Sequence, residues 1–254
     1  MSGSLVPSNE EPELFQMNPV DFNAIAVSVQ DVKARIASAC GRAGRRIEDV
    51  TLLAVTKFNP IESVMASYHA GIKCFGENRV QEAEAKYCAI QKKYPDIELH
   101  LLGHLQGNKI KKALGIFDCI QSVDSENLVR DLSLRCISED TTMDVLYELH
   151  TGEESKSGFS SVDDLFRAIE NTSSLPGINL RGLMTMAPFT EDPSAIRASF
   201  RTCAEAFRKA REIFNGDDFT ILSMGMTNDF EIAIEEGSTM VRIGTAIFGK
   251  RARI

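Results

Sequence analysis

The sequence lacks any long apolar run. No stretch of its 254 residues approaches the roughly 20 consecutive apolar residues that a membrane-spanning helix needs, so we predict no membrane partner. The N-terminus also lacks a basic start followed by an apolar stretch, which argues against a secretory signal. Basic residues are too few to balance the acidic ones, and the formal net charge is -8. That deficit disfavours a general binder of nucleic acid or anionic membranes.

Paired cysteines and linkers are missing as well. The cysteines are scattered without a CxxC pair, at Cys40, Cys74, Cys88, Cys119, Cys136 and Cys203. In a chain of this size, such usage indicates reduced thiols and a cytoplasmic location rather than a disulfide framework. Residues 1–17 show no periodicity and are rich in Ser, Pro, Asn and Glu, so we expect a flexible tail there. No linker-like stretch follows, which predicts one domain over residues 18–254.

What the sequence does contain is a repeated rhythm of short apolar run, turn and helical stretch. A helical pattern covers about residues 18–44. Strands are then predicted at 50–56, 72–75, 98–102, 119–123, 143–149, 179–186, 219–222 and 240–243. Helices are predicted between them at 61–70, 79–93, 108–114, 126–137, 162–170, 196–214 and 230–235.

This strict alternation implies parallel strands joined by helical crossovers. Eight such units predict an α/β fold, namely a single (β/α)8 TIM-type barrel preceded by an N-terminal helix. An open doubly wound sheet is the alternative.

The first predicted strand ends in Lys57. Residues 52–55 are all apolar, which is typical of a strand buried on both faces, and the chain turns at Asn59-Pro60. In a barrel, this arrangement places an amine at the C-terminal mouth, where barrel enzymes carry their chemistry. The alternative is a lysine that leaves the core and extends its amine to water.

The last two strands carry further candidate groups. Arg242 points into the barrel if its neighbours face the helices, and it would then contact either an internal acid or a ligand. Small-residue turns follow strands seven and eight, at Ser223-Met224-Gly225 and Gly244-Thr245. Loops at these two positions of a barrel frequently bind phosphate. Together with Lys57, the groups suit a phosphorylated aldehyde, because a lysine amine forms an imine with an aldehyde.

Two other sets of residues receive simpler interpretations. His100 and His104 are four residues apart, but no third ligand is evident, so we predict no metal site. Glu84 with Lys86, and the pair Glu235-Glu236, are typical of solvated surface charge.

Several blocks of the sequence, in this order, resemble one protein family. The blocks are Leu52–Lys57, Phe75–Glu82, His100–Lys109, Ser122–Ser125, Gly152–Phe159, Arg181–Pro188, Ser223–Thr227 and Val241–Gly244. They resemble the pyridoxal phosphate homeostasis protein family (YggS/PROSC), which shares the barrel of the alanine racemase N-terminal domain. The resemblance covers about residues 20–250.

The resemblance implies a cofactor, pyridoxal 5'-phosphate (PLP), and a set of residues that bind it. It implies that Lys57 holds PLP as a Schiff base, that Arg242 faces the pyridine nitrogen, and that Asn78 lines the pocket. The turns after strands seven and eight would contact the phosphate. The implied cofactor-binding set is Lys57, Asn78, Ser223, Met224, Arg242, Gly244 and Thr245. One departure, His150 where Asn is common, bears on the rim of the pocket.

The predicted function is binding and supply of PLP within the cell, without turnover. An arginine beside the ring nitrogen disfavours protonation of that nitrogen, which makes the ring a poorer electron sink. Racemases of the resembling fold add a second base from a C-terminal β domain, and we expect none here. Partners would be PLP and PLP-dependent apo-enzymes, with the chain a monomer or weak dimer. The alternatives are a small alanine-racemase-like enzyme and an aldolase-type Schiff-base enzyme.

Overall fold

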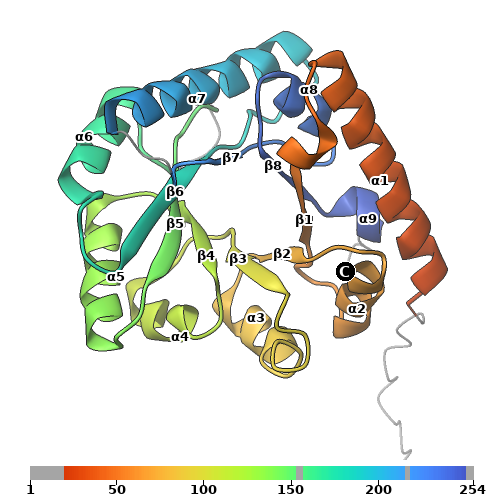
Figure 1. Ribbon diagram of the computed structural model, residues 1–254, viewed down its shortest axis with the longest axis horizontal. Coiled ribbons are helices and arrows are strands. Elements are labelled where there is room, and N and C mark those ends of the chain that lie inside the picture. Colours follow the sequence, from red (N-terminus) through yellow and green to blue (C-terminus); the bar gives the residue numbers. More distant parts are fainter. Residues whose placement is uncertain (1–19, 153–156, 215–217, 250–254) are drawn as a thin grey trace, which may run out of the picture.

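The strands form a closed barrel. The structure, a computed structural model, describes residues 20–152, 157–214 and 218–249, and within them eight parallel strands pair in chain order until β8 meets β1 (Figure 1). The strands are β1 (Thr51–Val55), β2 (Cys74–Glu77), β3 (Glu98–Leu101), β4 (Cys119–Val123), β5 (Met143–Glu148), β6 (Ile178–Met184), β7 (Ile221–Ser223) and β8 (Met240–Ile243). The predicted barrel is confirmed. The tail predicted at 1–17 lies outside the described residues.

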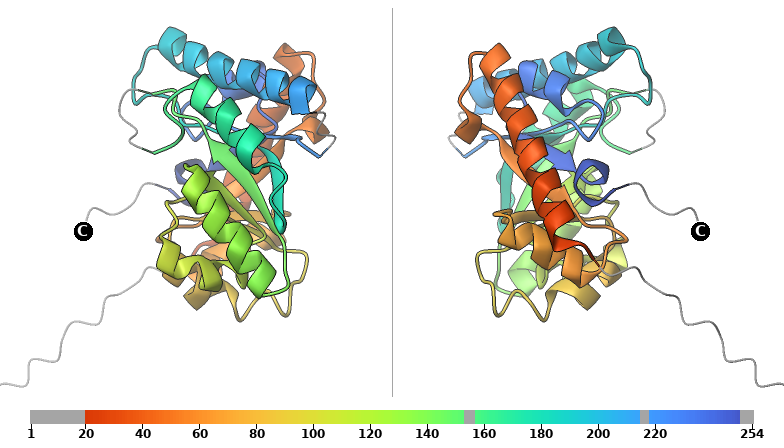
Figure 2. Two further views of the ribbon diagram at one scale, coloured as in Figure 1. Left: turned by 90° about the vertical axis from the view of Figure 1, so that its left-hand side faces the viewer. Right: turned by 90° about the vertical axis from the view of Figure 1, so that its right-hand side faces the viewer.

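Helices surround this barrel on the outside (Figures 1 and 2). They are α1 (Phe22–Arg42), α2 (Ile61–His69), α3 (Val80–Tyr87), α4 (Ile110–Leu114), α5 (Glu126–Ser138), α6 (Val162–Thr172), α7 (Pro193–Phe214), α8 (Phe230–Glu235) and α9 (Thr245–Phe248). Short 3₁₀ turns lie at Ile47–Asp49 and Gly107–Lys109. None of the helices in the described ranges combines the length and apolar character needed to cross a bilayer.

Two helix predictions need correction. The charged helix predicted over 79–93 ends at Tyr87, and the chain continues as turns in which Lys93 N donates to Ile90 O. Ile90 N and Gln91 N both donate to Tyr87 O, so successive turns replace the regular helical hydrogen bonds beyond Tyr87. The short helix α9 after β8 was not predicted, because four residues show too little periodicity to be recognised.

Successive side chains along each strand point alternately into the barrel and toward the helices, so they pack in two separate apolar regions. Leu53 and Val55 of β1 belong to a cluster with Cys74 and Met240 in the barrel interior. Residues of opposite parity, such as Ala54, pack with the helices in the large outer core. Thr56 continues the outward parity, so the same alternation directs position 57 toward the barrel axis.

An apolar face attaches helix α1 to the barrel. The helix begins at Phe22, and its cap is the Asp21 side chain, which accepts a hydrogen bond from Ala24 N. Its buried side chains recur every three or four positions, at Ile25, Val29, Val32, Ile36, Ala39 and Cys40. This spacing places them along one stripe, which packs on the barrel beside α2, α8 and α9.

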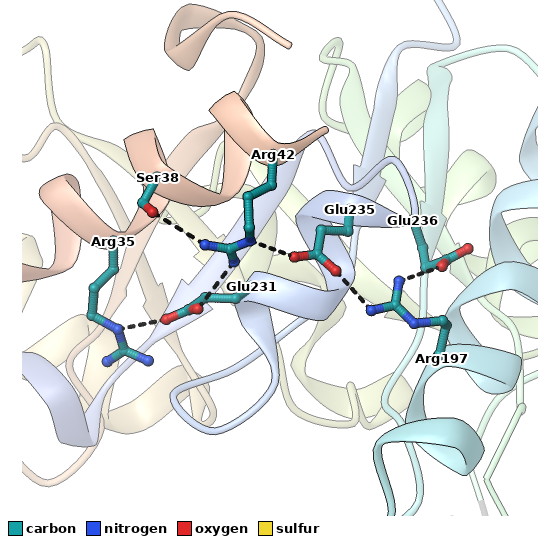
Figure 3. Close-up of polar contacts among 7 residues, drawn as sticks. All are labelled: Arg35, Ser38, Arg42, Arg197, Glu231, Glu235 and Glu236. Carbon is teal, nitrogen blue, oxygen red and sulfur yellow. Dashed lines mark hydrogen bonds and ion pairs between the residues drawn. The ribbon is translucent and has the colours of Figure 1, made fainter. Parts of the chain in front are cut away.

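An ion-pair network joins α1 to α8 and α7 (Figure 3). Arg42 Nε lies 2.8 Å from Glu235 Oε1, and its terminal nitrogen lies 3.2 Å from Glu231 Oε2. Arg35 also contacts Glu231, at 2.7 Å. On the other side, Arg197 of α7 lies 2.7 Å from Glu235. Glu235 is partly exposed, at 23% of its side chain, and its carboxylate lies between two arginines from different helices.

The network predicts a salt-dependent contribution to stability. Arg42→Met is expected to lower the urea midpoint slightly at low salt, since the side chain is 46% exposed and exposed pairs contribute little. At about 1 M NaCl, where the screening length is about 3 Å, the difference from wild type should nearly vanish. Arg46→Met, which removes only the local pair with Asp49, is the matched control. A large loss that is insensitive to salt would contradict this account.

Candidate functional site

The predicted site residues gather at one end of the barrel. In a closed parallel barrel, the C-terminal ends of all strands meet at a single mouth. All seven predicted cofactor-binding residues lie at or just after the end of a strand. They are Lys57 after β1, Asn78 after β2, Ser223 and Met224 at the end of β7, and Arg242, Gly244 and Thr245 at the end of β8. Because β1 lies between β2 and β8, the segments of Lys57, Asn78 and Gly244 are neighbours.

Lys57 lies half-buried in a tight turn between β1 and α2. Asn59 N donates to Thr56 O at 3.0 Å and closes the turn. Phe58 has φ 64, a left-handed conformation that is uncommon for a bulky residue. Gly244 packs closely on the same strand, because a Cβ there would lie 3.3 Å from Val55 O. The turn that carries the lysine is thus irregular and lies beside the predicted phosphate-binding segment.

Arg242 lies inside the barrel, fixed by neutral acceptors. One terminal nitrogen donates to Ser223 O at 2.7 Å and to Ser223 Oγ at 2.8 Å, and the other donates to Thr185 O at 2.8 Å. Among the described residues, no carboxylate forms an ion pair with it. Burial lowers the pKa of the guanidinium to about 10, so it remains charged at neutral pH. A buried cation without an ionic partner suits a ligand with an electron-rich atom.

The Ser223 hydroxyl supports Arg242 within the barrel. It donates to Gln121 Oε1 at 2.6 Å while it accepts from Arg242 at 2.8 Å. Its predicted contact with a phosphate stays a prediction. Gln121 of β4 was not predicted, although a glutamine in a strand buried along its whole length is a signal that could have identified it.

The other predicted residues differ in accessibility. Met224 is fully buried, and its side chain packs in the outer core rather than in the interior. Thr245 is exposed at the start of α9. Asn78 is half-buried, and its side-chain amide makes no hydrogen bond with another described residue. Gly103 allows its backbone to lie close to that of Asn78, because a Cβ at 103 would lie only 2.3 Å from Asn78 O. Roles for these residues in cofactor binding stay predictions.

Glu148 is a buried acid at the end of β5, also on the mouth side. Burial is the largest effect on its carboxyl and raises the pKa above its usual value. Ser157 Oγ donates to Glu148 Oε1 at 2.8 Å and opposes this shift, as does the positive charge of Arg242. The acid therefore keeps its proton to a higher pH in the folded protein than in the unfolded chain.

This raised pKa predicts a pH-dependent stability difference. Wild type should be most stable relative to Glu148→Gln below about pH 4.3, the unfolded pKa of glutamate. The difference should shrink as the pH rises toward the raised folded pKa, because the unfolded state then releases its proton first. Urea unfolding of both proteins between pH 4 and about 7.5 measures the difference. If the difference in unfolding free energy between the two proteins stays constant over this pH range, the raised pKa of Glu148 is contradicted.

The two candidate histidines do not share a site. His100 Nε2 lies 2.7 Å from Glu98 Oε1, whereas His104 Nδ1 lies 3.1 Å from Asp124. Cys74, Glu98 and His100 do bring their ligand atoms within 4.8 Å of one another, at the N-terminal ends of β2 and β3. Burial raises the pKa of the Cys74 thiol well above its usual value, which favours the neutral thiol over the metal-binding thiolate. We assign no metal to this cluster.

Comparison with known proteins gives the family. The family model for the alanine racemase N-terminal domain matches residues 27–252. A pyridoxal phosphate homeostasis protein of Aquifex aeolicus is 41% identical over 220 residues, covering 87% of this chain and 95% of that protein. The chain belongs to the pyridoxal phosphate homeostasis protein family. The resemblance noted from the sequence blocks is thereby confirmed.

Solved structures of similar proteins agree with this membership. The crystal structure of an unknown protein from Bifidobacterium adolescentis is 37% identical in sequence, with a TM-score of 0.83 and coverage of 91% of this chain and 98% of that chain. PipY from Synechococcus elongatus, whose structure has PLP bound, is 32% identical, with a TM-score of 0.77. That comparison covers 89% of this chain and all of the PipY chain.

Proposed function

We propose that this protein binds PLP at the mouth of the barrel and serves the supply of PLP inside the cell, without turnover of its own. Similar proteins carry the name pyridoxal phosphate homeostasis protein, and PipY binds PLP. The observation that carries the proposal is the pairing of Lys57, at the end of β1, with the buried cation Arg242 on the adjacent strand β8. An aldehyde and an aromatic nitrogen on one small ligand match these two groups.

The covalent step needs only the lysine. Lys57 would hold PLP, because a neutral lysine amine condenses with an aldehyde and releases water. The turns after β7 and β8 then lie where barrels frequently bind phosphate, with Gly244 and Thr245 as the contacts. Arg242 faces the ring nitrogen in this proposal, and Ser223 with Gln121 keeps the guanidinium in place.

The protein's own residues argue against turnover. PLP can act as an electron sink in amino acid chemistry, and a protonated ring nitrogen strengthens that action. Arg242, which remains charged at neutral pH, disfavours a second positive charge beside it. Tyrosine is an acid/base residue in several enzymes, but Tyr87 and Tyr147 are fully buried with raised pKa values, that of Tyr147 at about 12. Tyr68 is engaged with Asp96 at 2.7 Å.

A supply assay tests this function. The PLP-loaded protein is mixed with a PLP-free aminotransferase, and recovery of aminotransferase activity is followed; alone, the loaded protein is tested with alanine and other amino acids. We expect recovery of the recipient's activity and no racemisation or transamination above a free-PLP control. Turnover at an ordinary enzymatic rate that is lost in Lys57→Ala would overturn the proposal in favour of a racemase-like enzyme.

Location and assembly belong to the same proposal. The six cysteines are free thiols and all but Cys88 are buried, which supports a reducing compartment such as the cytoplasm. We propose that the chain acts as a monomer or weak dimer and that PLP-dependent apo-enzymes receive the cofactor. Size-exclusion chromatography with light scattering measures the assembly state.

A further inference from the structure

A buried polar cluster lies outside the barrel wall, between β2 and α3. Lys86 of α3 is only 10% exposed in its side chain, and Glu77 of β2 is completely buried. Their side chains approach to 2.5 Å, and Thr56 Oγ donates to the same Glu77 oxygen at 2.7 Å. Tyr87 OH lies 2.7 Å from Thr56 Oγ. The prediction that Lys86 is a solvated surface charge is therefore wrong.

The Lys86 ammonium holds both ends of the turn that carries Lys57. Its Nζ donates to Thr56 O at 2.8 Å and to Asn59 O at 3.0 Å. These carbonyls belong to the first and last residues of the four-residue turn 56–59. A single cation therefore connects the two ends of the turn, and Lys57 lies between them.

Glu82, one helical turn before Lys86, holds the middle of the same turn. Its Oε1 accepts from Phe58 N at 2.5 Å and from Lys86 Nζ at 2.9 Å. Phe58 is the residue with φ 64, a left-handed conformation that is uncommon for a bulky non-glycine residue. The contacts from α3 thus compensate for backbone strain directly after Lys57.

We propose that Lys86 is a positioning residue for Lys57. Resting on the proposed function, this inference assigns to α3 the task of fixing the turn so that the Lys57 amine meets the PLP aldehyde. Lys86 itself does not contact the cofactor, because its contacts are on the outer side of the barrel wall. Glu77 contributes by neutralising the buried ammonium, while Glu82 joins that ammonium to the Phe58 amide.

A purely structural role for Lys86 makes a different prediction. A buried charge pair that only stabilises the fold would lower global stability when broken, and all slowly exchanging amides would lose protection together. A positioning role predicts a local effect instead. The amides of Phe58 and Asn59 would open while those of the distant strands β5 and β6 keep their exchange rates.

Hydrogen exchange on the PLP-free protein, followed by PLP titration, distinguishes these roles. In Lys86→Met we expect exchange at Phe58 and Asn59 to accelerate by at least about tenfold relative to wild type, with β5 and β6 unchanged. The Kd for PLP should rise by about tenfold or more. Lys112→Met, which removes an exposed lysine paired with Glu84, is the matched control and should behave as wild type.

A second variant keeps the test decisive if Lys86→Met does not fold. Glu82→Gln leaves Lys86 with Glu77 but weakens the acceptor for the Phe58 amide, so it should accelerate exchange at Phe58 by a smaller factor. Exchange at Phe58 and Asn59 within about twofold of wild type in every folded variant would overturn the inference. If Lys57→Ala still retained PLP covalently, the proposed function would fail, while the exchange data would still report on Lys86.

Discussion

Replacement of Lys57 by alanine is expected to abolish covalent retention of PLP. The imine requires a primary amine at the ligand's aldehyde, and alanine supplies none. PLP added to the variant should therefore give the spectrum of the free aldehyde, without the visible absorbance of an imine. After borohydride treatment, the variant should keep the mass of the bare chain, whereas wild type should gain the mass of one reduced PLP adduct.

The matched control for this variant is Lys111→Ala. Lys111 lies on α4 with its side chain 68% exposed and paired with Glu139, away from the mouth. Surface lysines form weak imines with free PLP, and the control measures that background. An imine band of wild-type strength in Lys57→Ala, lost in another lysine variant, would move the site elsewhere.

Replacement of Arg242 by methionine is expected to have the second largest effect on PLP binding. The proposed contact of the guanidinium with the ring is a charge-assisted hydrogen bond, which contributes about 1.5–3 kcal/mol. Its loss corresponds to about a 10- to 150-fold increase in the Kd for PLP. Fluorescence or absorbance titration of the variant with PLP measures the change, with the imine at Lys57 still able to form.

A loss of fold must be separated from this loss of affinity. Without Arg242, Thr185 O remains buried without its donor, which costs about 1–3 kcal/mol of stability. Arg181→Met is the control, because Arg181 lies in β6, two strands from β8, and pairs with Asp144 at 2.7 Å. Urea unfolding of both variants measures how much each substitution lowers the free energy of unfolding. A folded Arg242→Met protein with wild-type PLP affinity would contradict a role for the guanidinium in binding.

The architecture was predictable because it depends on repeated local patterns. Apolar runs and helical stretches alternate strictly, and a closed barrel follows from eight such units. Helix α5 begins at Glu126 as predicted, and the Ser125 side chain caps it by accepting from Leu128 N. The end of α3 was misplaced because the charged residues beyond Tyr87 resemble a helical surface, whereas the chain forms successive turns there.

The positions of Lys57 and Arg242 were predictable because both lie at strand ends, and the C-terminal strand ends of a barrel meet at one mouth. Their roles in cofactor binding stay predictions. The support around them depends on pairs distant in sequence: Gln121 with Ser223, and Lys86 with Glu77. A lysine on an amphipathic helix has the same local pattern whether its amine reaches water or a buried carbonyl, so no local pattern distinguishes the two.

The most direct test of the central claim is to locate the PLP adduct on the wild-type chain. The protein is loaded with one equivalent of PLP, reduced with borohydride, digested, and its peptides are sequenced by tandem mass spectrometry. The account predicts a single modified residue, Lys57, in the peptide that joins β1 to α2. An adduct confined to another lysine, or PLP that binds tightly yet leaves no adduct after reduction, would contradict it.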